Sequence, residues 1–322
     1  MAKTVSVRQD SSPDLKLRKK TTAHRLWTRL RGSLGLYLFL VPAVLYFFIH
    51  NYLPIYGVQL AFKTFQPNLG IVGSPWIGLE NFRRFFQSFF FTRLIRNTVG
   101  LNLYALAASF PIPIILALLF NEINRPRIKK SVQTISYAPH FISSVVLVSI
   151  MTIFFSQTGF VNRLLDRMSA QPIPFLTSPR LFPHMYVWSG VWQNAGWSSI
   201  IYIAALSGID PELHEAAQID GANRRKRIWH INIPGILPTM VILFILNTGR
   251  IMNVGFEKIF LMQNSQNQST SDVISTYVYR MGFINMEYGF STAVSLFNNV
   301  INLALLLLVN WISRKVTEHT LF

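Results

Sequence analysis

The 322-residue sequence contains no cysteine, which excludes disulfides, thiolate metal sites and cysteine nucleophiles. Charged residues are scarce at 13% of the chain, while 51% are hydrophobic and the mean hydropathy is +0.33. A soluble protein of this length needs more charged surface than that. The composition therefore predicts a polytopic membrane protein.

Sequence signatures of enzymes are also missing. The chain has no G-x-x-x-x-G-K-[ST] phosphate loop, no H-E-x-x-H zinc motif and no G-x-S-x-G nucleophile elbow. We therefore expect no catalytic residues, no metal site and no ATP hydrolysis by this chain alone. The net charge of +17 could suggest nucleic acid, but the basic residues sit on short segments beside apolar runs, so we expect no such partner.

Long apolar runs predict an all-α fold with six transmembrane helices. Each run is near the ~20 residues needed to cross the hydrocarbon core of a bilayer. The predicted spans are 33–53, 94–120, 132–156, 185–207, 237–262 and 290–311.

The distribution of lysine and arginine predicts the orientation of these spans. Alternate segments hold nineteen basic residues, nine of them in the tail 1–32, whereas the opposite side holds eight. The positive-inside rule then places both termini and the loop 210–238 in the cytoplasm. We divide the chain into a basic cytoplasmic tail, 1–32, and a transmembrane domain, 33–322, that contains this loop.

The loop 210–238 is the only long polar interval deep in the apolar part of the chain. Asp210 and Pro211 predict a helix start, because Asp caps free N–H groups and Pro loses no bond at the first helical position. Gly221 predicts a left-handed turn that ends this helix. A second helical piece is predicted from about residue 222 to 231, ended by Pro234 and Pro238. The product is a helix–turn–helix that could dock a soluble protein at the membrane surface.

The residues of this loop resemble the EAA motif of the membrane subunits of type I ABC importers, a bacterial family. The matching residues are Glu215, Ala216, Ala217, Asp220, Gly221, Ala222, Ile231, Pro234 and Pro238. Ile228 and Ile233 stand where the family pattern has Phe and Leu, and both exchanges stay apolar. The match covers under a tenth of the chain. The bland alternative is a cytoplasmic loop that merely caps two helices.

The resemblance implies a coupling helix that fits a cleft in a cytoplasmic ATPase. Its contacts would come from Glu215, Ala216, Ala217, Asp220, Gly221, Ala222, Pro234 and Pro238. It further implies a second homologous permease, two ATPase subunits that bind ATP and Mg²⁺, an extracytoplasmic solute-binding protein, and the bacterial inner membrane as location. No cofactor is expected in this chain. Segments 54–93 and 276–283 resemble the carbohydrate-uptake branch, in particular its oligo- and polysaccharide members, so an oligosaccharide is the expected solute.

Polar residues within the predicted spans are candidates for the solute path. In span 237–262, Asn247, Arg250 and Asn253 recur every three residues and predict a polar stripe on one side of one helix. In span 290–311 the corresponding face carries Ser295, Asn298 and Asn302, and in span 185–207 the candidates are Trp192, Gln193 and Asn194. These side chains could line the path, or they could join neighbouring helices by hydrogen bonds.

Two other classes of function fit the sequence less well. An ion-coupled secondary transporter needs acidic residues within its spans, and Glu257 is the only clear one. A membrane glycosyltransferase needs paired carboxylates near one face, whereas the outer segments offer only scattered ones. Co-purification with an ATPase would separate both from an importer subunit.

Overall fold

The computed structural model describes residues 34–249, 251–252 and 254–316. The chain divides into two compact units, 1–57 and 58–322. In the first unit, α2 (Leu34–Phe47) continues into the π-helical turn η1 (Phe48–Tyr52) and then into η2 (Leu53–Phe62), in which the boundary falls. The described side chains of Tyr37–Tyr52 are apolar almost all round and exposed, which suits a helix surrounded by lipid or by a partner subunit.

The regular elements in the described part of the second unit are all helices, apart from one isolated bridge between Lys63 and Trp76. Its first helices are α3 (Gly70–Gly73), α4 (Glu80–Phe86), α5 (Phe91–Ser109), α6 (Pro111–Asn121), α7 (Pro126–Tyr137), η3 (Ala138–Phe141), α8 (Ser144–Phe155) and α9 (Phe160–Arg167). The rest are α10 (Phe182–Ser207), α11 (Pro211–Ile219), α12 (Arg224–Arg227), η4 (Ile228–Asn232), α13 (Ile233–Thr248), α14 (Phe256–Met262), α15 (Gln268–Ser271), α16 (Ile274–Tyr279), η5 (Arg280–Ile284) and α17 (Tyr288–Val316).

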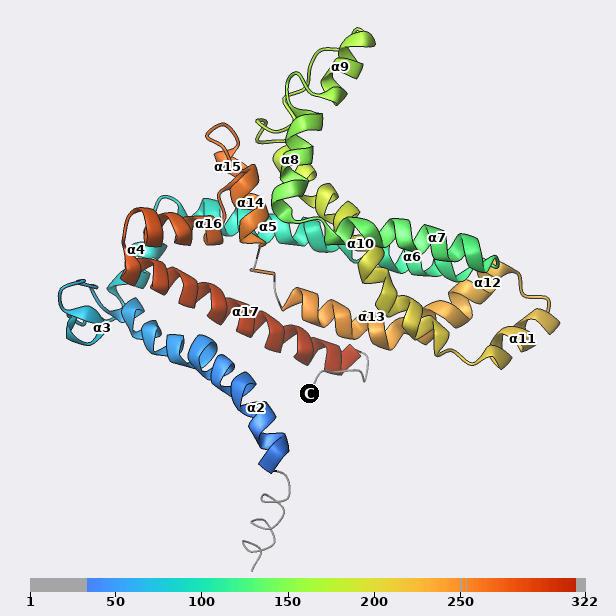
Figure 1. Cartoon of the computed structure of the whole chain (residues 1–322), viewed down its shortest axis with the longest axis horizontal. Helices are drawn as coiled ribbons and strands as arrows, with labels where there is room; N and C mark the ends of the chain where they lie inside the picture. Colours follow the sequence, from blue (N-terminus) through green and yellow to red (C-terminus); the bar gives the residue numbers. More distant parts are fainter. Residues whose placement is uncertain (1–33, 250, 253, 317–322) are drawn as a thin grey trace, which may run out of the picture. The chain divides into compact units, whose positions relative to one another are not determined.

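Helix α10 lies at the centre of this unit and packs against α5, α6, α7 and α13 (Figure 1). Its buried residues contribute to two apolar clusters. Val187 and Val191 pack with residues of α5, α8 and α14, while Tyr202 and Leu206 pack with residues of α6 and α13. A third cluster joins α4, α5, α16 and α17 around Phe85, which is fully buried. Helix α10 thus takes part in two of the three apolar clusters.

Five stretches of the described chain are long and apolar enough to cross a membrane. They are Tyr37–Phe62, Phe91–Asn121, Ser144–Arg167, Arg224–Thr248 and Tyr288–Lys315. The predicted span 185–207 lies in α10, which has 26 residues but is not among the five. Its tryptophan and amide side chains lower its hydropathy, so the sixth span remains a prediction.

Two predicted spans are not continuous helices, and both predictions are corrected here. The span 132–156 is interrupted at residues 138–143, where Pro139 has no N–H to donate and Ser143 caps the new helix α8 through the N–H of Val146 at 3.3 Å. The span 237–262 is interrupted between Thr248 and Phe256. Such breaks are tolerated in membrane helices only where neighbouring groups satisfy the freed backbone.

Candidate functional site: a coupling loop and a polar cavity

The loop 210–238 begins as the sequence predicts. The Asp210 carboxylate accepts a hydrogen bond of 2.9 Å from the N–H of Glu212, which caps α11, and Pro211 occupies the first turn. Glu212 adds negative charge where the helix dipole favours it. The residues expected of a helix start therefore form one.

Gly221 ends α11 in a Schellman motif. Its φ is +77°, in the left-handed region, and its N–H donates to the carbonyl of Gln218 at 3.0 Å. The next N–H, of Ala222, reaches back to the carbonyl of Ala217 at 2.8 Å. This pair of bonds defines the motif, in which the residues at Ala217 and Ala222 face each other. The EAA and DGA halves of the loop thus correspond to the last turn of one helix and the reversal that follows it.

After the turn the chain forms one unbroken helix. Asn223 accepts a hydrogen bond of 2.9 Å from the N–H of Lys226, and helix then runs through α12, η4 and α13 to Thr248. The prediction that Pro234 and Pro238 end the second piece is wrong: Pro234 lies in the first turn of α13 and Pro238 lies inside it. The π-helical turn η4, just before Pro234, changes the local backbone pairing. Proline lacks an N–H, and this change accommodates it without ending the helix.

Few charged side chains of the loop form ion pairs within the described chain. Arg224 lies 3.7 Å from Glu122, at the end of α6, and this is the only ion pair of the loop in the described residues. Glu215 is exposed and contacts none of the loop's own arginines in the part of the chain that the structure describes. Glu215 therefore forms no ion pair within the loop in the described residues.

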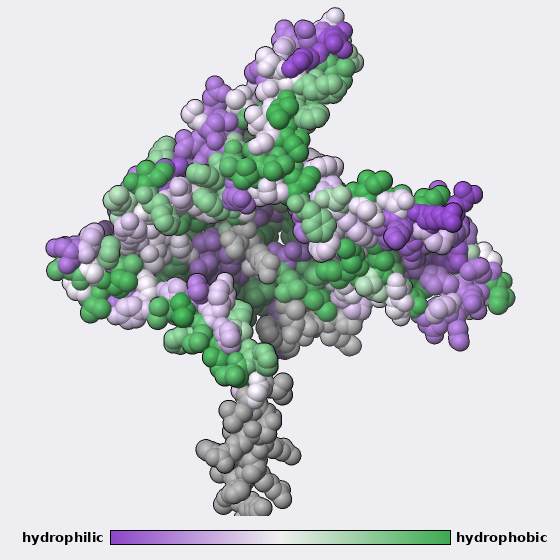
Figure 2. All heavy atoms as spheres, in the orientation of Figure 1, coloured by the Kyte–Doolittle hydropathy of each residue, from purple (hydrophilic) through white to green (hydrophobic). Residues whose placement is uncertain are grey.

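Large apolar side chains on the loop are exposed. Ile219 is 87% exposed, Trp229 67% and Leu213 54%. Hydrophilic residues otherwise cover α11 and α12 (Figure 2). Exposed apolar residues surrounded by polar ones are typical of a protein-binding surface.

A cavity of about 680 Å³ lies in the helical unit, between α5, α6, α10, α13 and α14. This volume is within the range of small-molecule binding sites. One face of α10 forms its longest wall, because Tyr186, Gly190, Asn194 and Trp197 recur at three- and four-residue spacing. Asn247 of α13 and Lys258 of α14 close the opposite side. The lining thus combines aromatic rings, amides and one ammonium group.

Three of the predicted path residues, Gln193, Asn194 and Asn247, line this cavity. Trp192 does not; it lies in a separate apolar groove against α8. Ser295, Asn298 and Asn302 do not line this cavity. Arg250 and Asn253 lie outside the described residues.

The predicted stripe on one side of one helix is wrong, because α13 ends at Thr248 and the chain restarts as α14. The backbone N–H and C=O groups of the residues between these helices therefore need other hydrogen-bond partners. Asn302 supplies one, since its side-chain oxygen accepts a hydrogen bond of 2.9 Å from the N–H of Met252. Asn302 therefore joins α17 to the break by a hydrogen bond, which matches the second of the two roles proposed for it.

Lys258, Tyr186 and Trp197 also line the cavity. Lys258 donates to the carbonyl of Tyr186 at 2.9 Å, and the ring of Trp197 stacks on His140 at 4.7 Å. The spacing of Tyr186, Gly190, Asn194 and Trp197 could have revealed the wall of α10 from the sequence. The sequence marks Lys258 as a charge inside the predicted span 237–262, but the apolar pattern does not show the break that precedes α14 and sets the direction of this side chain.

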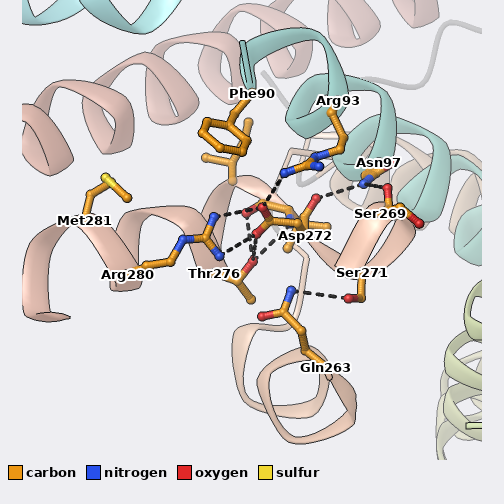
Figure 3. Close-up of polar contacts among 12 residues, drawn as sticks. Phe90, Arg93, Asn97, Gln263, Ser269, Ser271, Asp272, Thr276, Arg280 and Met281 are labelled. Carbon is orange, nitrogen blue, oxygen red and sulfur yellow. Dashed lines mark hydrogen bonds and ion pairs between the residues drawn. The ribbon is translucent and has the colours of Figure 1, made fainter. Parts of the chain in front are cut away.

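A second polar cluster lies around Asp272, which is fully buried (Figure 3). Arg280 donates to its carboxylate at 2.8 and 3.3 Å, and Arg93 of α5 at 3.4 Å. Thr276 donates to the same carboxylate at 3.1 Å, while Asn97 donates to the backbone carbonyl of Asp272 at 3.0 Å. The cluster fastens residues 272–280 to α5.

Residues 109–318 match the family described as the binding-protein-dependent transport system inner membrane component. The chain belongs to this family. It is therefore a multi-pass inner-membrane protein, the permease subunit of an ABC importer rather than an enzyme. The family resemblance drawn from the loop 210–238 is confirmed.

Relatives match the permease over nearly its whole length. Protein LplB of Bacillus subtilis is 43% identical over 294 residues, covering 91% of this chain and 92% of the relative. The polygalacturonan/rhamnogalacturonan transport system permease protein YteP of Bacillus subtilis is 38% identical over 315 residues, covering 98% of each.

Two solved structures have the same fold with a TM-score of 0.84. One is a bacterial ABC transporter involved in the import of the acidic polysaccharide alginate, 41% identical, with 91% of this chain and 99% of that chain covered. The other is a bacterial alginate ABC transporter in complex with a periplasmic protein that holds an alginate pentasaccharide, 39% identical, with 92% and 100% covered.

Proposed function

We propose that this permease passes an oligosaccharide, or the end of a polysaccharide, from an extracytoplasmic solute-binding protein into the cytoplasm by alternating access. The cavity carries this proposal. It combines the indole of Trp197 with the amides of Asn194 and Asn247, and sugars bind to flat aromatic rings flanked by hydrogen-bonding groups. The saccharides named for YteP and for the two solved structures support the same class of solute.

We propose that a second, homologous permease completes the membrane part and that two ATPase subunits bind ATP and Mg²⁺ on the cytoplasmic side. The loop 210–238 is the proposed contact to the ATPase. Exposed Leu213, Ile219 and Trp229 supply its apolar contacts, and the unpaired carboxylate of Glu215 suits a basic group on the partner. In this arrangement the six predicted spans have both termini and this loop in the cytoplasm, with the basic tail 1–32 at the anionic leaflet.

A reconstitution experiment tests the proposal. The permease, its partner permease, the ATPase and the binding protein are placed in liposomes, and uptake of radiolabelled oligosaccharides is measured with and without ATP. We expect uptake that requires both ATP and the binding protein. Uptake driven by a proton or sodium gradient without ATP would support the ion-coupled alternative and contradict the proposal.

A further inference from the structure

We infer that Lys258 makes the cavity a binding site for a carboxylate, so that the solute is an acidic oligosaccharide that contains uronic acid units. This inference rests on the proposed function, which names only the saccharide class. It adds the charge of the solute and the residue that recognises it.

The ammonium group of Lys258 has unused hydrogen-bonding capacity inside the cavity wall. It donates to the carbonyl of Tyr186 at 2.9 Å and lies 4.9 Å from the centre of the Tyr186 ring. An ammonium has three donors and no acceptor. In the described part of the chain only the Tyr186 carbonyl accepts from it. Donors therefore remain for a ligand.

Lys258 has no acidic partner among the described residues. The four ion pairs found there are Arg84–Glu287, Arg93–Asp272, Arg224–Glu122 and Arg280–Asp272. Glu257 is the next residue, but it is exposed and points about 100° away around the helix. A partly buried charge without an acidic partner is costly unless other polar groups or a ligand offset it. A neutral donor would serve the Tyr186 carbonyl as well, so the positive charge points to an anion that arrives from outside the chain.

The remaining lining favours a carboxylate rather than opposing it. Lys258 is the only charged group among the described residues that line the cavity, so a carboxylate meets no anion there. Gly190 keeps the wall open beside the ammonium, because a Cβ at that position would lie 3.3 Å from the Lys258 Nζ. The ring of Trp197 and the amide of Asn194 lie farther along the same face of α10. Space for a sugar ring therefore adjoins the charge.

The basic groups of the Asp272 cluster and of α12 do not offer this combination. Arg93 and Arg280 are occupied by the buried carboxylate of Asp272. The arginines of α12 lie on the exposed loop and line no part of this cavity. Lys258 is thus the cation placed to meet a solute in the cavity.

The test compares two trisaccharides that differ only in charge. Trigalacturonate and its carboxyl-reduced, neutral counterpart are measured for binding to the complete transporter in nanodiscs by equilibrium dialysis, without the binding protein, so that only the membrane part selects. Lys258→Gln removes the charge with little change in size, Lys258→Arg keeps it, and Lys130→Gln removes an exposed charge elsewhere. Uptake into liposomes with the binding protein is measured in parallel.

We expect Lys258→Gln to weaken trigalacturonate binding by about ten- to one hundred-fold, the range for a charge-assisted hydrogen bond. Binding of the neutral trisaccharide should stay within about two-fold. Lys258→Arg should keep most of the preference, and Lys130→Gln should match the wild type.

Equal effects of Lys258→Gln on both sugars, no effect on trigalacturonate, or a wild type that binds neither sugar would each overturn the carboxylate site. ATP-dependent uptake of the neutral trisaccharide alone would overturn the site but leave the proposed function standing. Uptake of no saccharide by the wild-type importer would overturn the proposed function itself.

Discussion

Asp272 shows how much a single buried charge can contribute to the fold of this permease. Its carboxylate is fully buried and holds Arg280, Arg93 and Thr276. Replacing it by Asn leaves two arginines without their anion, and breaking a buried pair in this way costs about 3–5 kcal/mol. We expect Asp272→Asn to lower the thermal unfolding midpoint in detergent by several degrees and to expose residues 272–280 to protease.

Glu287→Gln is the matched control. The Glu287–Arg84 pair has a similar distance, 2.7 Å, but both side chains are partly exposed, at 33% and 55%. Exposed pairs contribute only about 0–1 kcal/mol. Equal losses of stability in the two variants would mean that burial does not determine the role of Asp272.

Individual residues divide sharply into those that the sequence could reveal and those it could not. Asp210 and Gly221 were predictable because their roles depend on their immediate neighbours. The partners of Asp272 were not, since Arg93 lies 179 residues away. The sequence shows Lys258 as a charge inside a predicted span, but it does not show the cavity that α10 and α13 form beside it.

Among the structural elements, the turn at Gly221 can be tested most directly by a single substitution. A Cβ at this position would meet nothing within 4 Å, so the strain of a substitution comes from the backbone alone, at roughly 1–2 kcal/mol. We expect Gly221→Val to insert in the membrane but to reduce ATPase stimulation by loaded binding protein at least about five-fold. The measurement is basal and stimulated ATPase activity of the assembled importer in liposomes.

Two variants accompany this test. Asn adopts the left-handed conformation more readily than other side chains, so Gly221→Asn should retain most of the stimulation. Gly100→Ala adds a Cβ in equally open space within α5, without a positive φ, and should have no effect. Wild-type stimulation in Gly221→Val would refute the coupling role of the loop.

The break between α13 and α14 gives a second prediction for an element. Asn302 is the acceptor for the N–H of Met252, and its loss leaves a buried donor without a partner, at about 1–3 kcal/mol. We expect Asn302→Leu to destabilise the permease in detergent, measured by thermal unfolding. Asn299→Leu, on the exposed side of the same helix, should not. If Asn302→Leu instead unfolds like the wild type and only loses transport, Asn302 serves the path.

The local sequence determines where α11 begins and ends, but it does not determine where a longer helix is interrupted. The start of α11 and the turn after it follow from capping residues that a reader of the sequence can recognise. The break after Thr248 depends on Asn302 of another helix, which compensates for the missing backbone bond. Pro234 and Pro238 mislead in the opposite direction, because a π-helical turn lets the helix continue.

The topology is a prediction for the whole molecule, and the absence of native cysteine makes it easy to test. Single cysteines at Val72 and Phe283, which are 74% and 71% exposed, should react with an impermeant maleimide added to intact cells. A cysteine at Arg225 should react only after the membrane is opened. Lys63 is a poor labelling site on the same outer segment, because it is buried and bonded to two carbonyls. Labelling at position 225 in intact cells would contradict the proposed orientation.

Fold class and family were accessible from the sequence because both depend on patterns that repeat or are specific: apolar runs of bilayer length and the EAA residues. The role of α10 as the central helix was not. Its polar residues weaken it as a membrane span, although they face a cavity and neighbouring backbone, as when Gln193 donates to the carbonyl of Ile142. A helix that packs against other helices and lines a cavity can have a lower mean hydropathy than a helix that faces lipid.

The unbroken helix from Arg224 to Thr248 makes the loop and the cavity two ends of one lever arm. Its 25 residues span about 37 Å at 1.5 Å per residue. Asn247, in the cavity wall, lies at one end, and the arginines that follow the Gly221 turn lie at the other. A tilt of about 10° at the loop would displace the cavity end by roughly 6 Å, about the rise of one helical turn. The break just beyond Thr248 separates this helix from α14, so we expect a tilt of α13 to move Asn247 in the cavity wall without an equal movement of Lys258.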